Sequence, residues 1–218
     1  MSTNKTKHKA PSHMNKHILP LLGLVTLLAS ATQASQEQLA ASIKEARGEA
    51  ARASEQLKTT LDTLTALTKQ KEGDLRPAFT AFTAQIPQTQ ADAKWTRACV
   101  DWMEGDGQRY FDGWQKTIDG IANESLRKKA QKRLETVRKS YDKVGVSLKS
   151  AGEKFQPFLS DLADVQKTLA SDLTAGGIKS VKSTVSDANW RYLDVRNAIN
   201  GALKEMDKMQ KALAPEAK

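Results

Sequence analysis

Apolar residues recur every three or four positions along most of this chain, and the longest unbroken series lies near its C-terminus. Its members are Ile178, Val181, Val185, Ala188, Tyr192, Val195, Ile199, Ala202, Met206, Met209 and Leu213. Residues three and four apart lie on one face of an α-helix, so the series predicts a helix with a continuous apolar face. Such a face is stable in water only when another helix covers it.

Two further stretches repeat this spacing. The first covers residues 36–71, with small or apolar residues at Leu39, Ile43, Ala46, Ala50, Ala53, Leu57, Thr60, Leu64 and Leu67. The other covers residues 124–173 and follows Asn123, a residue type favoured at a helix N-cap. Its series is Ala130, Leu134, Val137, Tyr141, Val144, Leu148, Ala151, Phe155, Phe158, Leu162, Val165 and Leu169. Pro157 does not shift the phase, so one kinked helix is expected here.

Residues 75–121 form a less regular helical stretch. Pro87 inside it is expected to kink or split the helix, and the Gly105-Asp106-Gly107 segment to bend it. Three tryptophans, Trp95, Trp102 and Trp114, follow helical spacing and are expected to fill the core around these breaks. Cys99 lies between two of them and is expected to be a small buried residue, with an intermolecular disulfide as the alternative.

The joints between these stretches are short, at Gly73-Asp74, at the segment before Asn123 and at Gly176-Gly177. Consecutive helices must therefore double back beside one another. The sequence predicts an all-α protein, an elongated antiparallel bundle of about four long helices with coiled-coil character. The spacing is compatible with closure of the apolar faces within one chain or between two copies in a homodimer.

Residues 1–34 have the composition of a secretory signal peptide. Lysines precede a 14-residue apolar run from Ile18 to Ala31, which is followed by small and polar residues. Cleavage after Ala34 or Ala31 is expected, with retention as an anchor as the alternative and Met14 as an alternative start. The helical bundle domain would then be residues 35–218, in a periplasmic or secreted protein.

Cleavage would also change the available chemistry. Removing the four lysines of this segment from 34 basic residues against 25 acidic ones leaves a net charge of +5. All three histidines, His8, His13 and His17, leave with it, so a Ser-His-Asp or Cys-His centre and a Cys/His zinc site are not expected. The carboxylates Asp101, Glu104, Asp106 and Asp112 are interpreted as solvated groups at a bend. No cofactor, metal or enzymatic activity is predicted.

Two surface features point to binding. The first half of the third long helix carries a basic surface off the apolar series, comprising Arg127, Lys128, Lys132, Arg133, Arg138 and Lys139. It fits an anionic lipid or envelope polymer, although a solvated face balanced by neighbouring acids is the simpler reading. Nucleic acid is not an expected partner of an exported protein. Trp190 lies off the series of the last helix, where it is either an exposed partner anchor or part of a wider buried face.

Several segments also resemble a known family. They are the Asn123 to Arg127 run, Arg138 with Tyr141, Phe155 to Leu159, Gly73-Asp74-Leu75, the Phe111 to Trp114 region and the Ala46 to Leu61 run. They resemble an uncharacterised bacterial family of exported helical proteins, domain of unknown function 2959. The resemblance implies an exported helical protein and brings no catalytic residue, cofactor or partner. Members often carry a cysteine at the processing site, which this chain lacks, so lipid anchoring is not expected.

Taken together, these features predict a non-enzymatic helical protein of the bacterial envelope that acts through contacts with a protein or another envelope component. Peripheral binding of anionic lipid or polymer is the alternative.

Overall fold

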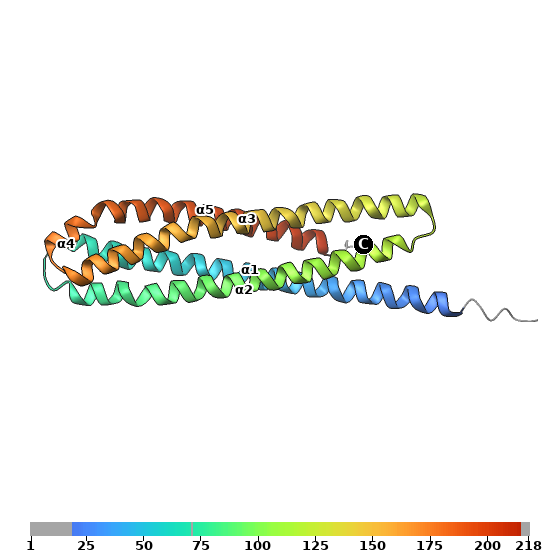
Figure 1. The fold of residues 1–218 in the computed structure, drawn as a ribbon, viewed down its shortest axis with the longest axis horizontal. Coiled ribbons are helices and arrows are strands. Elements are labelled where there is room, and N and C mark those ends of the chain that lie inside the picture. Colours follow the sequence, from blue (N-terminus) through green and yellow to red (C-terminus); the bar gives the residue numbers. More distant parts are fainter. Residues whose placement is uncertain (1–18, 71, 215–218) are drawn as a thin grey trace, which may run out of the picture.

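The computed structural model describes residues 19–70 and 72–214, with side chains described from Gln33 onward. In this part of the chain the elements are all helical: α1 (Leu19–Lys69), α2 (Arg76–Asp119), α3 (Glu124–Ser171), α4 (Ala175–Ser180) and α5 (Lys182–Leu213). They form an elongated bundle in which consecutive long helices run in opposite directions (Figure 1). The predicted all-α antiparallel bundle is confirmed. The predicted targeting segment lies mostly outside this description, because residues 1–18 and the side chains before Gln33 are not part of it.

The long helices form two antiparallel pairs that lie side by side. α1 packs along α2, and α3 packs along α5. Contacts between α1 and α5 and between α2 and α3 join the pairs, so each long helix has two neighbours. None of the helices among the described residues is long and apolar enough to cross a membrane.

The apolar series identified in the sequence form the core. All nine positions in α1 and all eleven from Ile178 to Leu213 are buried. In α3, eight of the twelve are buried, while Ala130, Tyr141, Leu148 and Phe155 are half-buried against the core. Two apolar clusters fill the rod end to end. The first holds Leu57 and Phe158 toward α4, and the second holds Leu39 and Met206 toward the α2–α3 loop.

The joints between helices differ in part from the prediction. Gly73, in the connection between α1 and α2, has a φ of 92°, a conformation that favours glycine. Asn123 caps α3 by accepting a hydrogen bond from the Leu126 N–H at 3.0 Å. The predicted Gly176-Gly177 joint does lie between the long helices α3 and α5, but both glycines are inside the short helix α4. Gly177 is needed there for space, since a Cβ would lie 1.9 Å from the Asp172 carbonyl oxygen.

α2 is one helix from Arg76 to Asp119. Of the two effects expected of Pro87, a kink or a split, the split is therefore wrong. Pro87 lies on the exposed face, where water can bond the carbonyl that proline leaves without a partner. The helix also continues through Gly105-Asp106-Gly107. Gly107 has a packing role, because the ring of Tyr141 on α3 occupies the space of its missing side chain and the Tyr141 hydroxyl donates to the Met103 carbonyl at 2.9 Å.

The tryptophans of α2 correct another prediction. Trp95 and Trp102 are 45% and 51% exposed and contact each other edge to face, with 5.4 Å between ring centroids. They do not fill the core, because α2 is not broken and its inward positions are taken by smaller residues such as Cys99 and Met103. Trp114 is half-buried against the core, and Cys99 is buried as predicted.

Candidate interaction surfaces

An open concave surface lies between α1 and α5, near the α4 end of the rod. We call it the Trp190 groove. It has a volume of about 510 Å³ and is lined by Thr65, Thr68 and Lys69 of α1 and by Lys182, Val185, Ser186, Asn189, Trp190 and Leu193 of α5. The groove exists because the residues that face each other across it are mostly small and polar, so no large side chains fill the space between the two helices.

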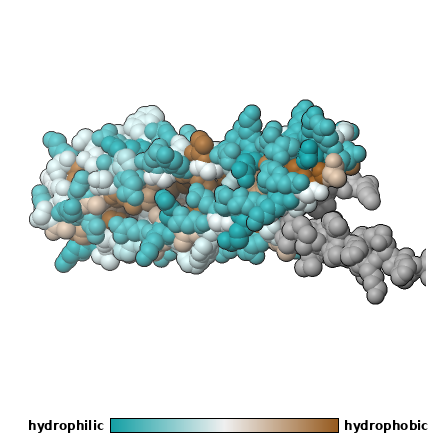
Figure 2. Space-filling model, turned by 45° about the vertical axis from the view of Figure 1, so that its right-hand side comes forward, coloured by the Kyte–Doolittle hydropathy of each residue, from teal (hydrophilic) through white to brown (hydrophobic). Residues whose placement is uncertain are grey.

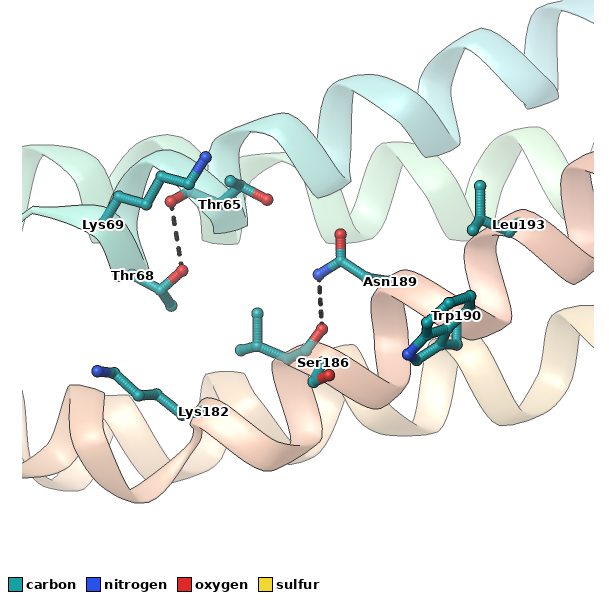
Figure 3. Close-up of a pocket in the computed structure, with 9 residues that line it drawn as sticks. Thr65, Thr68, Lys69, Lys182, Ser186, Asn189, Trp190 and Leu193 are labelled. Carbon is teal, nitrogen blue, oxygen red and sulfur yellow. Dashed lines mark hydrogen bonds between the residues drawn. The ribbon is translucent and has the colours of Figure 1, made fainter.

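The groove has a basic end and an apolar end. Figure 3 shows Lys69 and Lys182, from opposite helices, at one end, and Trp190 and Leu193 at the other. Neither lysine has an ion-pair or hydrogen-bond partner within the described residues, and no carboxylate is among the nine lining residues. Trp190 is 68% exposed. Of the two readings of Trp190 left open by its position off the apolar series, the structure favours the exposed one.

The polar side chains of the groove are held by their own helices. The Thr68 hydroxyl donates to the Leu64 carbonyl at 3.0 Å, and the Asn189 amide donates to the Val185 carbonyl at 2.7 Å. These bonds fix the side chains, so that the remaining acceptor sites of the hydroxyl and amide oxygens are available to a bound molecule. Figure 2 shows apolar surface along the middle of the visible face and in separate patches, each between hydrophilic side chains.

A second open groove lies between α1 and α5 at the other end of their contact. It has a volume of about 530 Å³ and lies beside Gln36, whose side chain donates to the Leu213 carbonyl at 2.6 Å. Between the two grooves, Arg47 of α1 pairs with Asp207 of α5 at 2.5 Å. Hydrogen bonding to Arg47 lowers the pKa of the Asp207 carboxyl. The two helices are therefore bridged between the grooves and open to solvent within them.

The basic surface predicted on α3 is divided by the structure. Arg138 lies against α2, with its guanidinium 4.9 Å from the centre of the Phe111 ring and 4.0 Å from Asp112. Arg133 donates to the Ala212 carbonyl at 3.2 Å, and Lys128 pairs with Glu124 at 2.7 Å. Arg127, Lys132 and Lys139 are exposed and have no such partner among the described residues. The half of this surface nearest the α2–α3 loop is thus the most available for binding.

The sequence suggested that the carboxylates of α2 are solvated, and the structure shows that some of them are buried. Asp106 is buried, with Arg109 and Gln38 as its partners, and Asp92 is buried with Arg52 at 2.6 Å and Gln88 at 2.8 Å. The two acids are fourteen residues apart on one helix, which separates them by roughly 21 Å. They serve the α1–α2 contact separately and do not converge on a shared site. The described residues hold no cluster of three or more metal-binding side chains.

Burial also shifts the pKa of two tyrosines and of the cysteine. Desolvation raises the pKa of Tyr110 to about 12, and raises the pKa of Tyr141 as well. It also raises the pKa of the Cys99 thiol, with nearby Glu45 and Glu49 acting in the same direction. All three groups therefore stay protonated at neutral pH, and they act here as packing residues.

Sequence reasoning found Trp190 and the basic surface but not the α1 wall of the groove. Thr65, Thr68 and Lys69 carry no motif, and their role depends on which residues of α5 lie opposite. The only available signal was that the flanks of both apolar series carry small polar residues.

Comparison with known proteins agrees with the resemblance seen in the sequence. A family model described as "Protein of unknown function (DUF2959)" matches residues 29–213. A search of curated proteins finds no match.

Proposed function

The chain belongs to the DUF2959 family, and from that premise we propose that it is a non-enzymatic helical protein that binds an acidic amphipathic helix of a partner in the Trp190 groove. The observation that carries the proposal is the exposed Trp190 beside a groove whose charged residues are both lysines. Exposed tryptophans at the edge of a concave surface are frequent anchors of protein interfaces.

The dimensions of the groove suit a helix. On α5 it extends from Lys182 to Leu193, twelve residues that span roughly 16 Å, about three turns of a partner helix. A helix that lies in such a groove presents apolar residues at positions i, i+3, i+4 and i+7. Those residues would pack on Val185, Leu193 and Trp190, and carboxylates at one end would meet Lys69 and Lys182.

The cellular location is part of the proposal. We infer a periplasmic or secreted protein, because the basic and then apolar order of residues 1–34 is that of an export signal. Fractionation of the native cells, with mass determination of the mature N-terminus, tests this inference. A protein that keeps residue 1 and stays in the cytoplasm would overturn it.

The binding proposal is tested with two synthetic amphipathic helices that share one apolar face and carry either glutamates or lysines on the polar face. Fluorescence anisotropy should show tighter binding of the glutamate peptide, weakened by salt. Trp190→Ala should weaken binding by about 2 kcal/mol, roughly thirty-fold, as expected for an interface anchor. Lys69→Glu with Lys182→Glu should reverse the preference between the two peptides.

The control variant is Lys149→Glu with Lys154→Glu, which makes the same change of net charge on exposed positions of α3 outside the groove. It should leave peptide binding unchanged. Equal binding of both peptides, binding of neither, or an equal effect of the control variant would overturn the proposal. So would a dimer, detected by sedimentation equilibrium, that Trp190→Ala dissociates.

A further inference from the structure

The end of the rod formed by the α2–α3 loop carries an unusual concentration of positive charge. Five cations, Arg127, Lys128, Lys129, Lys132 and Arg133, fall within the first ten residues of α3 and are exposed. Within the described residues, the side chains of Lys128 and Arg133 have the partners described above. The side chains of Arg127, Lys129 and Lys132 form neither an ion pair nor a hydrogen bond with a described residue. We call these three residues the basic tip.

This charge does not stabilise the helix that carries it. The N-terminal end of a helix has a partial positive charge, so a cation in its first turn is unfavourable and a carboxylate is favourable. The first turn of α3 contains Glu124 and Arg127, and the other four cations follow within the next two turns. Repulsion among neighbouring cations adds to the cost. An anionic surface outside the protein would offset both effects.

The basic tip is also accessible and carries an apolar residue. The described part of α5 ends beside Arg133, so α3 before that point lacks the cover that α5 gives the rest of the helix. Leu126 is 57% exposed there, next to Arg127 in sequence. The flank of α3 further along is different, because Arg138 is engaged with Phe111 and Asp112.

The N-terminus of α1 lies at the same end of the rod as the α2–α3 loop (Figure 1). The residues before Leu19 join α1 at this end. They belong to the proposed export signal, which carries four lysines and no acidic residue before the apolar run and contacts a membrane during export. This end of the rod is therefore the one nearest to a lipid surface when the chain is exported.

We propose that this end of the rod docks on the surface of an anionic lipid bilayer, with the basic tip at the phosphate groups and Leu126 inserted between the headgroups. The contact depends on side chains of α3 and is independent of the Trp190 groove. Each basic residue near an anionic surface contributes roughly five-fold to membrane partitioning. Loss of all three cations of the tip should therefore reduce membrane partitioning through this end of the rod by roughly a hundred-fold.

The test places an environment-sensitive dye at Leu126→Cys in the full chain, with Cys99→Ala so that the dye attaches at one position. Val146→Cys is the matched control, because Val146 is also an exposed apolar residue of α3 (71%) and lies outside the tip. Vesicles of phosphatidylcholine, with or without phosphatidylglycerol, are the probe. The emission of the dye at position 126 should shift to the blue only with vesicles that contain phosphatidylglycerol, and this shift should disappear at high salt. The emission of the dye at position 146 should not change.

The charge test compares two triple variants of the labelled chain with equal net charge. Arg127→Glu, Lys129→Glu and Lys132→Glu should abolish the shift. Lys149→Glu, Lys154→Glu and Lys179→Glu, which are exposed positions toward the other half of the rod, should preserve it. Substitutions at exposed positions change stability little, so the tip variant should keep its fold, which circular dichroism verifies.

Three results would overturn the proposal: an equal shift at position 146, an equal shift with neutral vesicles, or a shift that survives in the tip variant. A shift produced equally by soluble polyglutamate would show a dissolved anionic partner and would also overturn it. Peptide binding in the Trp190 groove should be unaffected by the tip variant, so the two proposals fail independently.

Discussion

Gly107 provides the most direct test of how α2 and α3 pack. A Cβ at this position would lie 2.3 Å from the hydroxyl oxygen of Tyr141 and 2.4 Å from the ring carbon that bears it. The ring has little freedom to move, because its hydroxyl donates to the Met103 carbonyl at 2.9 Å and the ring packs edge to face with Phe111, with 5.4 Å between centroids. Gly107→Ala must therefore displace Tyr141.

The expected magnitude combines three effects. Alanine favours a helix interior over glycine by about 1 kcal/mol. Overpacking a filled contact costs about 1–3 kcal/mol, and loss of the tyrosine hydrogen bond costs about 1 kcal/mol more. Gly107→Ala should thus lower the free energy of unfolding by about 1–3 kcal/mol, measured by urea denaturation followed by circular dichroism.

Gly105 is the matched control, two residues away in the same helix. A Cβ there meets only the flexible end of Arg109, at an ordinary 3.6 Å. Gly105→Ala should therefore raise the free energy of unfolding by up to about 1 kcal/mol. In a Tyr141→Ala background the clash is absent, so Gly107→Ala should become stabilising too. If Gly107→Ala stabilises the wild-type chain as Gly105→Ala does, the packing of α3 on α2 described here is wrong.

Three further predictions concern the core, the thiol and pH. Val195→Asp places a carboxylate at a fully buried position, so the cooperative thermal transition should be lost, whereas Leu148→Asp at a half-buried position should only lower its midpoint. Cys99 is 1% exposed and burial raises the pKa of its thiol, so a disulfide reagent should modify it slowly at neutral pH until the chain is unfolded, and reductant should not change the sedimentation coefficient. The pKa of Asp207 is lower in the folded chain than in the unfolded one. Its pairing with Arg47 therefore stabilises the fold fully at a pH above the pKa of the unfolded chain, and this stabilisation is lost as the pH falls through the pKa of the folded chain. Asp207→Asn should therefore make unfolding less dependent on pH in the acid range.

The helices and their buried faces were predictable because the bundle repeats one local rule. A residue such as Val195 or Leu64 is buried wherever its position in the repeat faces the neighbouring helices, and that position is a property of the helix alone. The capping of α3 by Asn123 was predictable for the same reason, since the side chain bonds an N–H three residues away.

Errors arose where a residue's role depends on another helix. Glycine is a residue type that weakens helices, but Gly107 provides the space in which the ring of Tyr141, thirty-four residues later in the sequence, packs. Gly177 lies in the predicted joint between α3 and α5, but inside the short helix α4, where a Cβ would collide with the Asp172 carbonyl. Intrinsic propensity costs about 1 kcal/mol per glycine, which tertiary packing readily exceeds. Glycines with open space around them, such as Gly48 and Gly145, also lie inside unbroken helices.

The two candidate surfaces also differ in whether they are formed by one helix or by two. The basic tip was visible in the sequence because its cations are neighbours on one helix, although the sequence alone did not separate Arg127 from the engaged Arg138. The Trp190 groove needs Thr65 and Lys69 opposite Lys182 and Asn189, a pairing that follows from the antiparallel register of α1 and α5. That register becomes available once both apolar series are aligned as one core. Small polar residues that then face each other on the flanks leave the space between two helices unfilled, and an exposed tryptophan beside that space gives a partner an apolar contact.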